Sequence, residues 1–126
     1  MKPGELTPLV KDPITRVQLV QYAGASGDFN PIHWDPERAR EMGLDGVIAH
    51  GMLSMGFLGQ YVAQVAGPQR VRRLKVRFAA MVRPGDELTC CGTVRSVEGG
   101  RAVLDVWAEN AEGDRVTTGE AEVEIG

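Results

Sequence analysis

The sequence GMLSMGFLGQYVAQVA, residues 51–66, decides the fold. Its large apolar side chains occur all around a 3.6-residue repeat; they are Met52, Leu53, Met55, Phe57, Leu58, Tyr61, Val62 and Val65. A helix that is apolar on every side is typically a buried helix. Gly56 and Gly59 lower the helix propensity but let other backbone approach closely. We therefore expect one long buried helix at the centre of the protein.

Four strands are expected after this helix, because apolar and polar residues alternate from about residue 73 to residue 125. Glycine and proline mark the turns between the strands, at 84–86, 99–100 and 112–114. An N-terminal segment, 6–10, is a candidate for a fifth strand. An antiparallel sheet with one polar face, wrapped around a long buried central helix, is an α+β arrangement.

Two shorter helices are expected before the central one. The first runs from residue 16 to residue 24 with Thr15 as its N-cap. Its predicted inward residues are Val17, Val20 and either Tyr22 or Ala23. The second covers residues 36–42, since Asp35 is a typical N-cap and Pro36 a typical first helical residue.

Length and composition exclude several classes of protein. A chain of 126 residues, 43% hydrophobic and 25% charged, fits one soluble globular domain over 1–126. A net charge of −3 argues against nucleic-acid binding. We also expect no signal peptide and no membrane span. The only cysteines, Cys90 and Cys91, would point to opposite faces of a strand, so no disulfide is expected and the cytoplasm is the expected location.

The residues that carry chemistry lie in the segment YAGASGDFNPIHWD, 22–35. Asp28 and His33 are five residues apart on a predicted loop that Gly27 and Pro31 stiffen. Imidazole accepts a proton near neutral pH, and a neighbouring carboxylate can hold the second hydrogen of a water molecule. An Asp–His pair around one water is therefore sufficient for hydration or dehydration.

Two blocks of the sequence resemble a known family. Ser26-Gly27-Asp28-Phe29-Asn30-Pro31-Ile32-His33 is similar to the signature of the MaoC-like, (R)-specific enoyl thioester hydratases and dehydratases. Residues 48–56 are similar to the start of that family's central helix. Both blocks also resemble the catalytic subunits of mycobacterial (3R)-hydroxyacyl-ACP dehydratases. The resemblance implies a hot-dog fold, in agreement with the sheet and helix expected above.

The resemblance also implies an activity in fatty acid metabolism. It is that of a hydro-lyase, which interconverts trans-2-enoyl thioesters of CoA or ACP and (R)-3-hydroxyacyl thioesters by syn addition or loss of water. Asp28 and His33 match the catalytic pair, and the Gly51 N–H would polarise the thioester carbonyl at the helix start. No metal and no cofactor are expected, because the thioester itself acidifies the α-carbon. Candidate substrate-binding residues are Asn30, Met52, Ser54, Met55, Arg73 and Arg77.

Simpler interpretations stay open beside these. Asp28 alone is typical of a turn and His33 of a structural histidine, but the octapeptide favours catalysis. His50 is expected to play a structural or supporting role at the helix start. With Asp28 and His33 it forms no typical zinc spacing. A Ser26–His33–Asp28 triad lacks a nucleophile elbow, and the methionines are most simply core.

The basic residues and the small size of the predicted sheet suggest which partners the protein binds. Arg73, Lys75 and Arg77 share one strand face, with Arg70, Arg72 and Arg83 nearby. A solvated sheet face is the simpler interpretation, and a docking surface for CoA phosphates or acidic ACP is the alternative. One small sheet cannot cover an apolar helix, so we expect a homodimer, with a heterodimer open, and neither membrane nor nucleic acid as partner. A hot-dog acyl thioesterase or an acyl-binding subunit of a heteromeric dehydratase is the alternative function.

Overall fold

The computed structural model describes residues 1–125, and its central element is helix α3, Gly51–Ala66. The prediction of one long helix here is confirmed. Leu58 and Val62 on the sheet side of α3 are completely buried. On the opposite side Met52, expected to be buried, is 54% exposed. The reason is that the sheet covers only one side of the helix.

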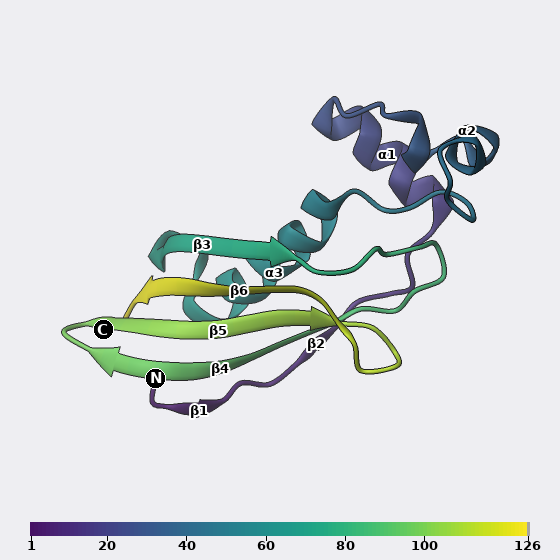
Figure 1. Cartoon of the computed structure of the whole chain (residues 1–126). Helices are drawn as coiled ribbons and strands as arrows, with labels where there is room; N and C mark the ends of the chain where they lie inside the picture. The colour runs from purple at the N-terminus through teal and green to yellow at the C-terminus, as the bar shows by residue number, and fades with distance from the viewer. Residues whose placement is uncertain (126) are drawn as a thin grey trace.

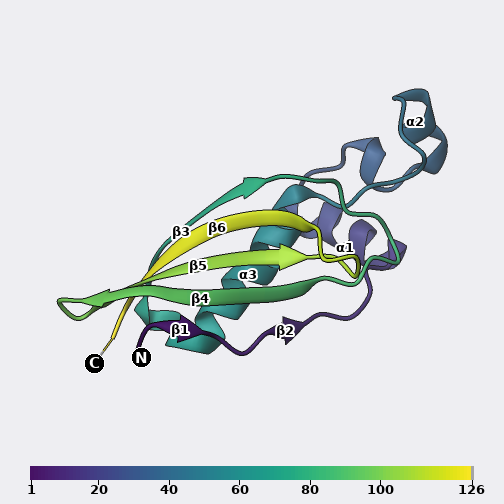
Figure 2. The ribbon, with the colours of Figure 1, turned by 60° about the horizontal axis from the view of Figure 1, so that its bottom comes forward.

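A six-stranded antiparallel sheet lies along α3 (Figures 1 and 2). Its strand order is β1-β4-β5-β6-β3, and β2 also pairs with β4. The strands are β1 Gly4–Glu5, β2 Leu9–Val10, β3 Val71–Phe78, β4 Thr89–Glu98, β5 Arg101–Glu109 and β6 Arg115–Glu124. The four predicted strands after the helix are confirmed. Of the N-terminal strand expected at 6–10, only β2 at its end forms, and β1 lies before the expected range. Gly99 and Gly100, both with positive φ, form the predicted hairpin turn.

The core lies between α3 and the inner face of the sheet. Along β5, every second residue faces the helix and is at most 1% exposed; these residues are Ala102, Leu104, Val106 and Ala108. Gly92 on β4 leaves room for the Tyr61 ring of α3, since a Cβ at this position would lie 3.1 Å from that ring. The predicted α+β arrangement, with the helix on one face of the sheet, is confirmed.

Two short helices, α1 Arg16–Ser26 and α2 Pro36–Glu41, lie beyond one end of the sheet (Figures 1 and 2). Both predicted N-caps are confirmed, because the side chains of Thr15 and Asp35 accept hydrogen bonds from the first backbone N–H groups of their helices. Helix α1 continues past residue 24 and ends before Gly27, whose φ of 76° is left-handed.

The inward side of α1 differs from the prediction. Leu19 and Ala23 are buried, whereas Val17 and Val20 are 66% and 55% exposed. Residues 19 and 23 are one helical turn apart and share a face. Helix α1 lies at the end of the sheet rather than on it, so this single face makes its contact with the core.

Within residues 1–125, no helix combines the length and the apolar character that crossing a membrane requires. Cys90 and Cys91 on β4 are free thiols, the first buried and the second half-buried.

Candidate active site

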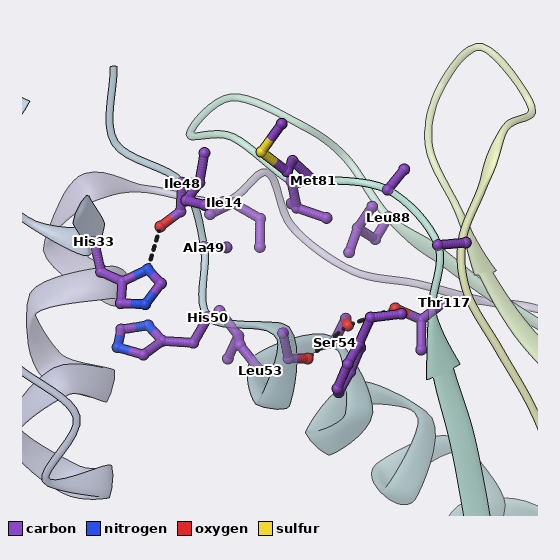
Figure 3. A pocket seen from close by; sticks show the side chains of 15 residues that line it. Ile14, His33, Ile48, Ala49, His50, Leu53, Ser54, Met81, Leu88 and Thr117 are labelled. Atoms are coloured by element: carbon purple, nitrogen blue, oxygen red, sulfur yellow. Dashed lines mark hydrogen bonds between the residues drawn. The ribbon is translucent and has the colours of Figure 1, made fainter. Parts of the chain in front are cut away.

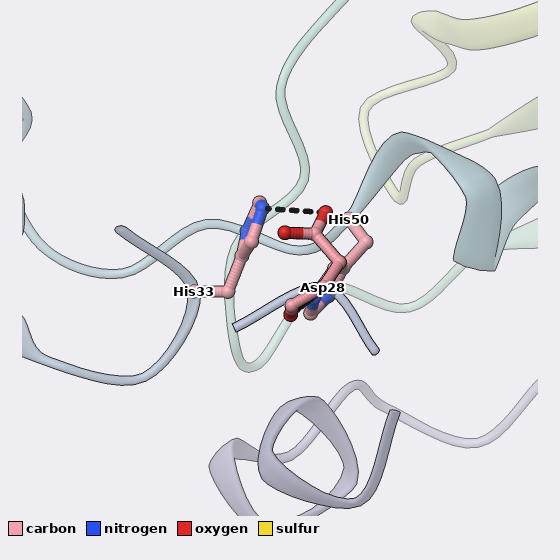
Figure 4. Close-up of side chains that lie close together, drawn as sticks. All are labelled: Asp28, His33 and His50. Carbon is pink, nitrogen blue, oxygen red and sulfur yellow. Dashed lines mark hydrogen bonds and ion pairs between the residues drawn. The ribbon is translucent and has the colours of Figure 1, made fainter. Parts of the chain in front are cut away.

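The loop between α1 and α2 holds the Asp28 carboxylate beside the His33 ring. Asp28 Oδ1 accepts a hydrogen bond from the Asn30 N–H at 3.2 Å. Asn30 in turn caps a short 3-10 helix, Pro31–His33, through its own side chain. Asp28 Oδ2 lies 3.8 Å from His33 Nε2 (Figure 4). The loop therefore uses one carboxylate oxygen to fix its turn and leaves the other facing the imidazole.

The second ring nitrogen of His33 determines where its hydrogen lies. Nδ1 is 2.8 Å from the Ile48 backbone oxygen (Figure 3). A carbonyl oxygen only accepts, so Nδ1 carries the hydrogen. In the neutral ring Nε2 then holds a lone pair, and this lone pair faces Asp28. His33 is only 7% exposed, so the surrounding protein holds this basic nitrogen in place.

A second histidine lies against the first (Figure 3). The rings of His50 and His33 are stacked, with 3.7 Å between their centroids and 24° between their planes. His50 Nε2 is 3.0 Å from the Asp28 backbone oxygen, and the Tyr22 ring packs edge-on at 4.8 Å. His50 is the N-cap residue of α3, but its side chain makes no capping bond. It contacts both members of the predicted pair instead.

Asp28, His33 and His50 offer ligand atoms that lie within 4.8 Å of one another. In stacked rings the in-plane lone pairs run nearly parallel, so they cannot both point at one ion about 2.1 Å away. His33 Nδ1 and His50 Nε2 are also engaged with backbone carbonyls. The donor set therefore fits a water molecule better than a metal ion.

Ser26 is not placed as a nucleophile. Its Oγ accepts a hydrogen bond from the Asp28 N–H at 3.2 Å. In a Ser–His–Asp triad the two imidazole nitrogens join the hydroxyl and the carboxylate. Here one nitrogen of His33 is taken by a backbone carbonyl, so the triad considered above is not assembled.

A cavity of about 450 Å³ extends from the two histidines along the start of α3 (Figure 3). Its lining is mostly apolar and includes Ile14, Ile48, Leu53, Met81, Val82 and Leu88. Gly51, the first residue of α3, is part of the wall. A Cβ at this position would lie 3.3 Å from the Phe78 ring, so glycine lets the ring pack on the helix start. The first N–H groups of a helix have no partner within it.

Two buried hydroxyl groups also line the cavity. Ser54 Oγ donates to the Gly51 backbone oxygen at 2.8 Å and lies 2.7 Å from Thr117 Oγ1. Because the one hydrogen of Ser54 is already used, Thr117 is the donor to Ser54. Thr117 thus ties β6 to α3 at this wall. The sequence analysis missed it, since no motif or pattern distinguishes it from the other threonines on the strands.

Five of the predicted substrate-binding residues lie outside the cavity lining. Asn30 supports the loop, Met52 is exposed and Met55 is half-buried. Arg73 lies on the outer face of the sheet, with Nη1 3.8 Å from Glu122 Oε1. Arg77 lines a separate hollow on that face, together with Lys75, Trp107 and Arg115.

An antiparallel sheet curved along one long helix, with the polar cluster at the helix start, defines a hot-dog protein. The solved (R)-hydratase from A. caviae involved in PHA biosynthesis has this fold. Its TM-score is 0.90 and its sequence identity 27%, over 100% of this chain and 98% of that chain. The family model described as MaoC like domain matches residues 3–115. The chain therefore belongs to the MaoC-like domain family, and the resemblance stated from the sequence is confirmed.

Two further comparisons show how widely this domain occurs. The fatty acid synthase beta subunit hexB of Dothistroma septosporum is 39% identical over 108 residues, which are 82% of this chain. The chain spans only 6% of the length of that protein. The ChsH1-ChsH2 complex from Mycobacterium tuberculosis shares the fold, with a TM-score of 0.88 and 23% identity over 100% of this chain and 98% of that chain.

Proposed function

We propose that this protein is a hydro-lyase that interconverts trans-2-enoyl thioesters and (R)-3-hydroxyacyl thioesters. The observation that carries the proposal is the bare Nε2 of His33, which faces Asp28 beside a mostly apolar cavity. Family membership and the similarity to an (R)-hydratase support the thioester substrate class.

The gap between His33 and Asp28 fits one water. Nε2 and Oδ2 are 3.8 Å apart, and a water about 2.8 Å from each lies at the apex of that triangle. Both atoms are acceptors, so the water donates both hydrogens and keeps its lone pairs free. In the hydration direction the water oxygen bonds to C3 and His33 takes one of its protons. The C2=C3 electrons move to the thioester oxygen. C2 then takes a proton from the Asp28–His33 pair.

This sequence of steps leaves the enzyme as it began, because the proton gained from water is returned to C2. Water and proton arrive from one side of the substrate, so the addition is syn. The enolate oxygen forms near the Gly51 N–H and the positive end of α3. In other enzymes the loss of one such donor costs about 3 kcal/mol.

The remaining assignments concern substrate and partner. The apolar cavity takes the acyl chain, with Ser54 on its wall. The exposed side of α3, which carries Met52, supports a dimer in which a second chain covers that side. The two-component ChsH1-ChsH2 complex gives a precedent for a non-identical partner. Light scattering after size exclusion tests this assembly, and a monomer at micromolar concentration would contradict it.

The decisive assay follows crotonyl-CoA by its enoyl absorbance, with a thiol reagent in a parallel sample. We expect the absorbance to fall to an equilibrium value without thiol release, and the product to be (R)-3-hydroxybutyryl-CoA. Stoichiometric thiol release would identify an acyl thioesterase instead. No turnover across short and long enoyl-CoA and enoyl-ACP substrates would also contradict the proposal.

A further inference from the structure

We infer that His50 is a positioning residue, which fixes the Asp28 backbone and the His33 ring in their working geometry. Its kinetic effect rests on the function proposed above, while its hydrogen-bonding role does not. Asp28, His33 and Gly51 account for the chemistry, and His50 acts through the first two.

The hydrogen bond of His50 determines its tautomer. Nε2 is 3.0 Å from the Asp28 backbone oxygen and must therefore donate. In the neutral ring Nδ1 then has no hydrogen, and this atom is buried without a hydrogen-bond partner among residues 1–125. A buried acceptor without a partner destabilises a fold and calls for an explanation. The hydrogen bond that the other nitrogen of His50 donates to the Asp28 backbone oxygen explains why a histidine lies here.

Three hydrogen bonds join the catalytic loop to the segment that leads into α3. The Ile48 N–H donates to the Ile32 oxygen at 3.0 Å, and His33 Nδ1 donates to the Ile48 oxygen at 2.8 Å. Both lie at the His33 end of the loop. The third, from His50 to Asp28, holds the other end. Without it, Asp28 would keep only its local turn bonds with Ser26 and Asn30.

His50 also limits the movement of the His33 ring. His50 is 3% exposed, and its ring contacts the Tyr22 ring edge-on and stacks on the His33 ring. It therefore fixes both members of the pair relative to the start of α3, where the Gly51 N–H lies. A displacement of about 1 Å between catalytic groups can cost about 100-fold in rate.

Two substitutions at residue 50 separate the donor from the ring. His50→Phe keeps a flat ring for stacking but removes the donor, and His50→Gln keeps an N–H donor. We expect His50→Phe to lower kcat about 10- to 100-fold with KM within about 2-fold, and His50→Gln to recover most of that loss. Equal losses in both variants, or a wild-type kcat for His50→Phe, would overturn the inference. Tyr22→Leu is the matched control for ring packing, with kcat expected within about 3-fold of wild type.

Nitrogen-15 NMR of the imidazole rings tests the inference without any assay of activity. We expect opposite tautomers in the wild-type protein, with hydrogen on Nε2 of His50 and on Nδ1 of His33. In His50→Phe we expect the amide signals of Asp28 and Asn30 to shift. A hydrogen on Nδ1 of His50, or unshifted amide signals, would overturn the inference. A wild-type protein that turns over no enoyl thioester overturns the proposed function, and the NMR results then decide on His50 separately.

Discussion

At the scale of single residues, the proposed mechanism makes Asp28 and His33 depend on each other, because each would accept one hydrogen of the same water. We expect Asp28→Asn and His33→Ala to lower kcat by about 1,000-fold or more. The first substitution removes the negative charge, and the second removes the proton acceptor. Steady-state kinetics on an enoyl-CoA gives the measurement, and circular dichroism shows that each variant is folded. A variant that turns over at the wild-type rate would contradict the assignment.

Cys90 provides a prediction on chemical reactivity. Burial raises the pKa of the Cys90 thiol to about 11, and the residue is completely buried. The thiolate is the form that reacts with alkylating agents. We therefore expect Cys90 to resist iodoacetamide at pH 8 in the folded protein and to react after denaturation in urea. Mass spectrometry of the peptides measures this, and rapid labelling of Cys90 in the native protein would contradict it.

The sequence predicted Asp28 and His33 as a catalytic pair, but it did not reveal the group that fixes the His33 tautomer. Asp28 and His33 stand in a recognisable octapeptide. The acceptor that fixes the His33 tautomer is the Ile48 carbonyl, 15 residues away. Every residue has such a carbonyl, so no sequence pattern marks this one. The sequence was sufficient to predict that His50 lies at the start of α3. Its stacking on His33 could not be predicted, because it depends on how the loop between α1 and α2 folds back.

At the scale of elements, local signals predicted where helices and strands begin, and tertiary contacts decided which sides are buried. The N-caps Thr15 and Asp35 act on neighbouring N–H groups, so sequence was sufficient for them. The inward side of α1 was predicted wrongly at Val17 and Val20. Burial there depends on the position of α1 beyond the end of the sheet, which its own residues do not encode.

Glycine positions in two elements give opposite predictions. A Cβ at Gly119 on β6 would overlap the Lys75 backbone oxygen on β3. We expect Gly119→Ala to lower the free energy of unfolding by about 2 kcal/mol. Gly24, within α1, has nothing within 4 Å of an added Cβ. Gly24→Ala should therefore raise the free energy of unfolding by about 0.5–1 kcal/mol. Urea denaturation measures both, and equal stability of the two variants would contradict the register of β3 on β6.

At the scale of the whole molecule, Arg73 and Arg77 both lie on the outer face of the sheet, but in different surroundings. Arg73 lies near Glu122, whereas Arg77 lines a hollow with Lys75 and Arg115. If CoA phosphates or an acidic carrier dock there, Arg77→Glu should raise KM about 10-fold at low salt with little change in kcat. Arg73→Glu is the matched control, with a smaller expected effect. An unchanged KM for Arg77→Glu at low salt would exclude docking at this face.

The sheet and its helix were predictable because alternation along the strands and the apolar run in α3 are properties of contiguous sequence. What would cover the outer side of α3 in the proposed dimer was not predictable. Met52 is exposed there, and in the proposed dimer a second chain would cover it. A single sequence contains no pattern that distinguishes a second copy from a different partner.

Ile48 combines two roles that use different atoms. Its carbonyl fixes the His33 tautomer, and its side chain lines the cavity. Main-chain atoms are the same whichever amino acid occupies the position. If the cavity takes the acyl chain as proposed, a substitution at residue 48 can change its shape while the backbone contact to His33 stays the same. A smaller side chain at this position would then be the first choice for admitting bulkier acyl groups to the proposed enzyme.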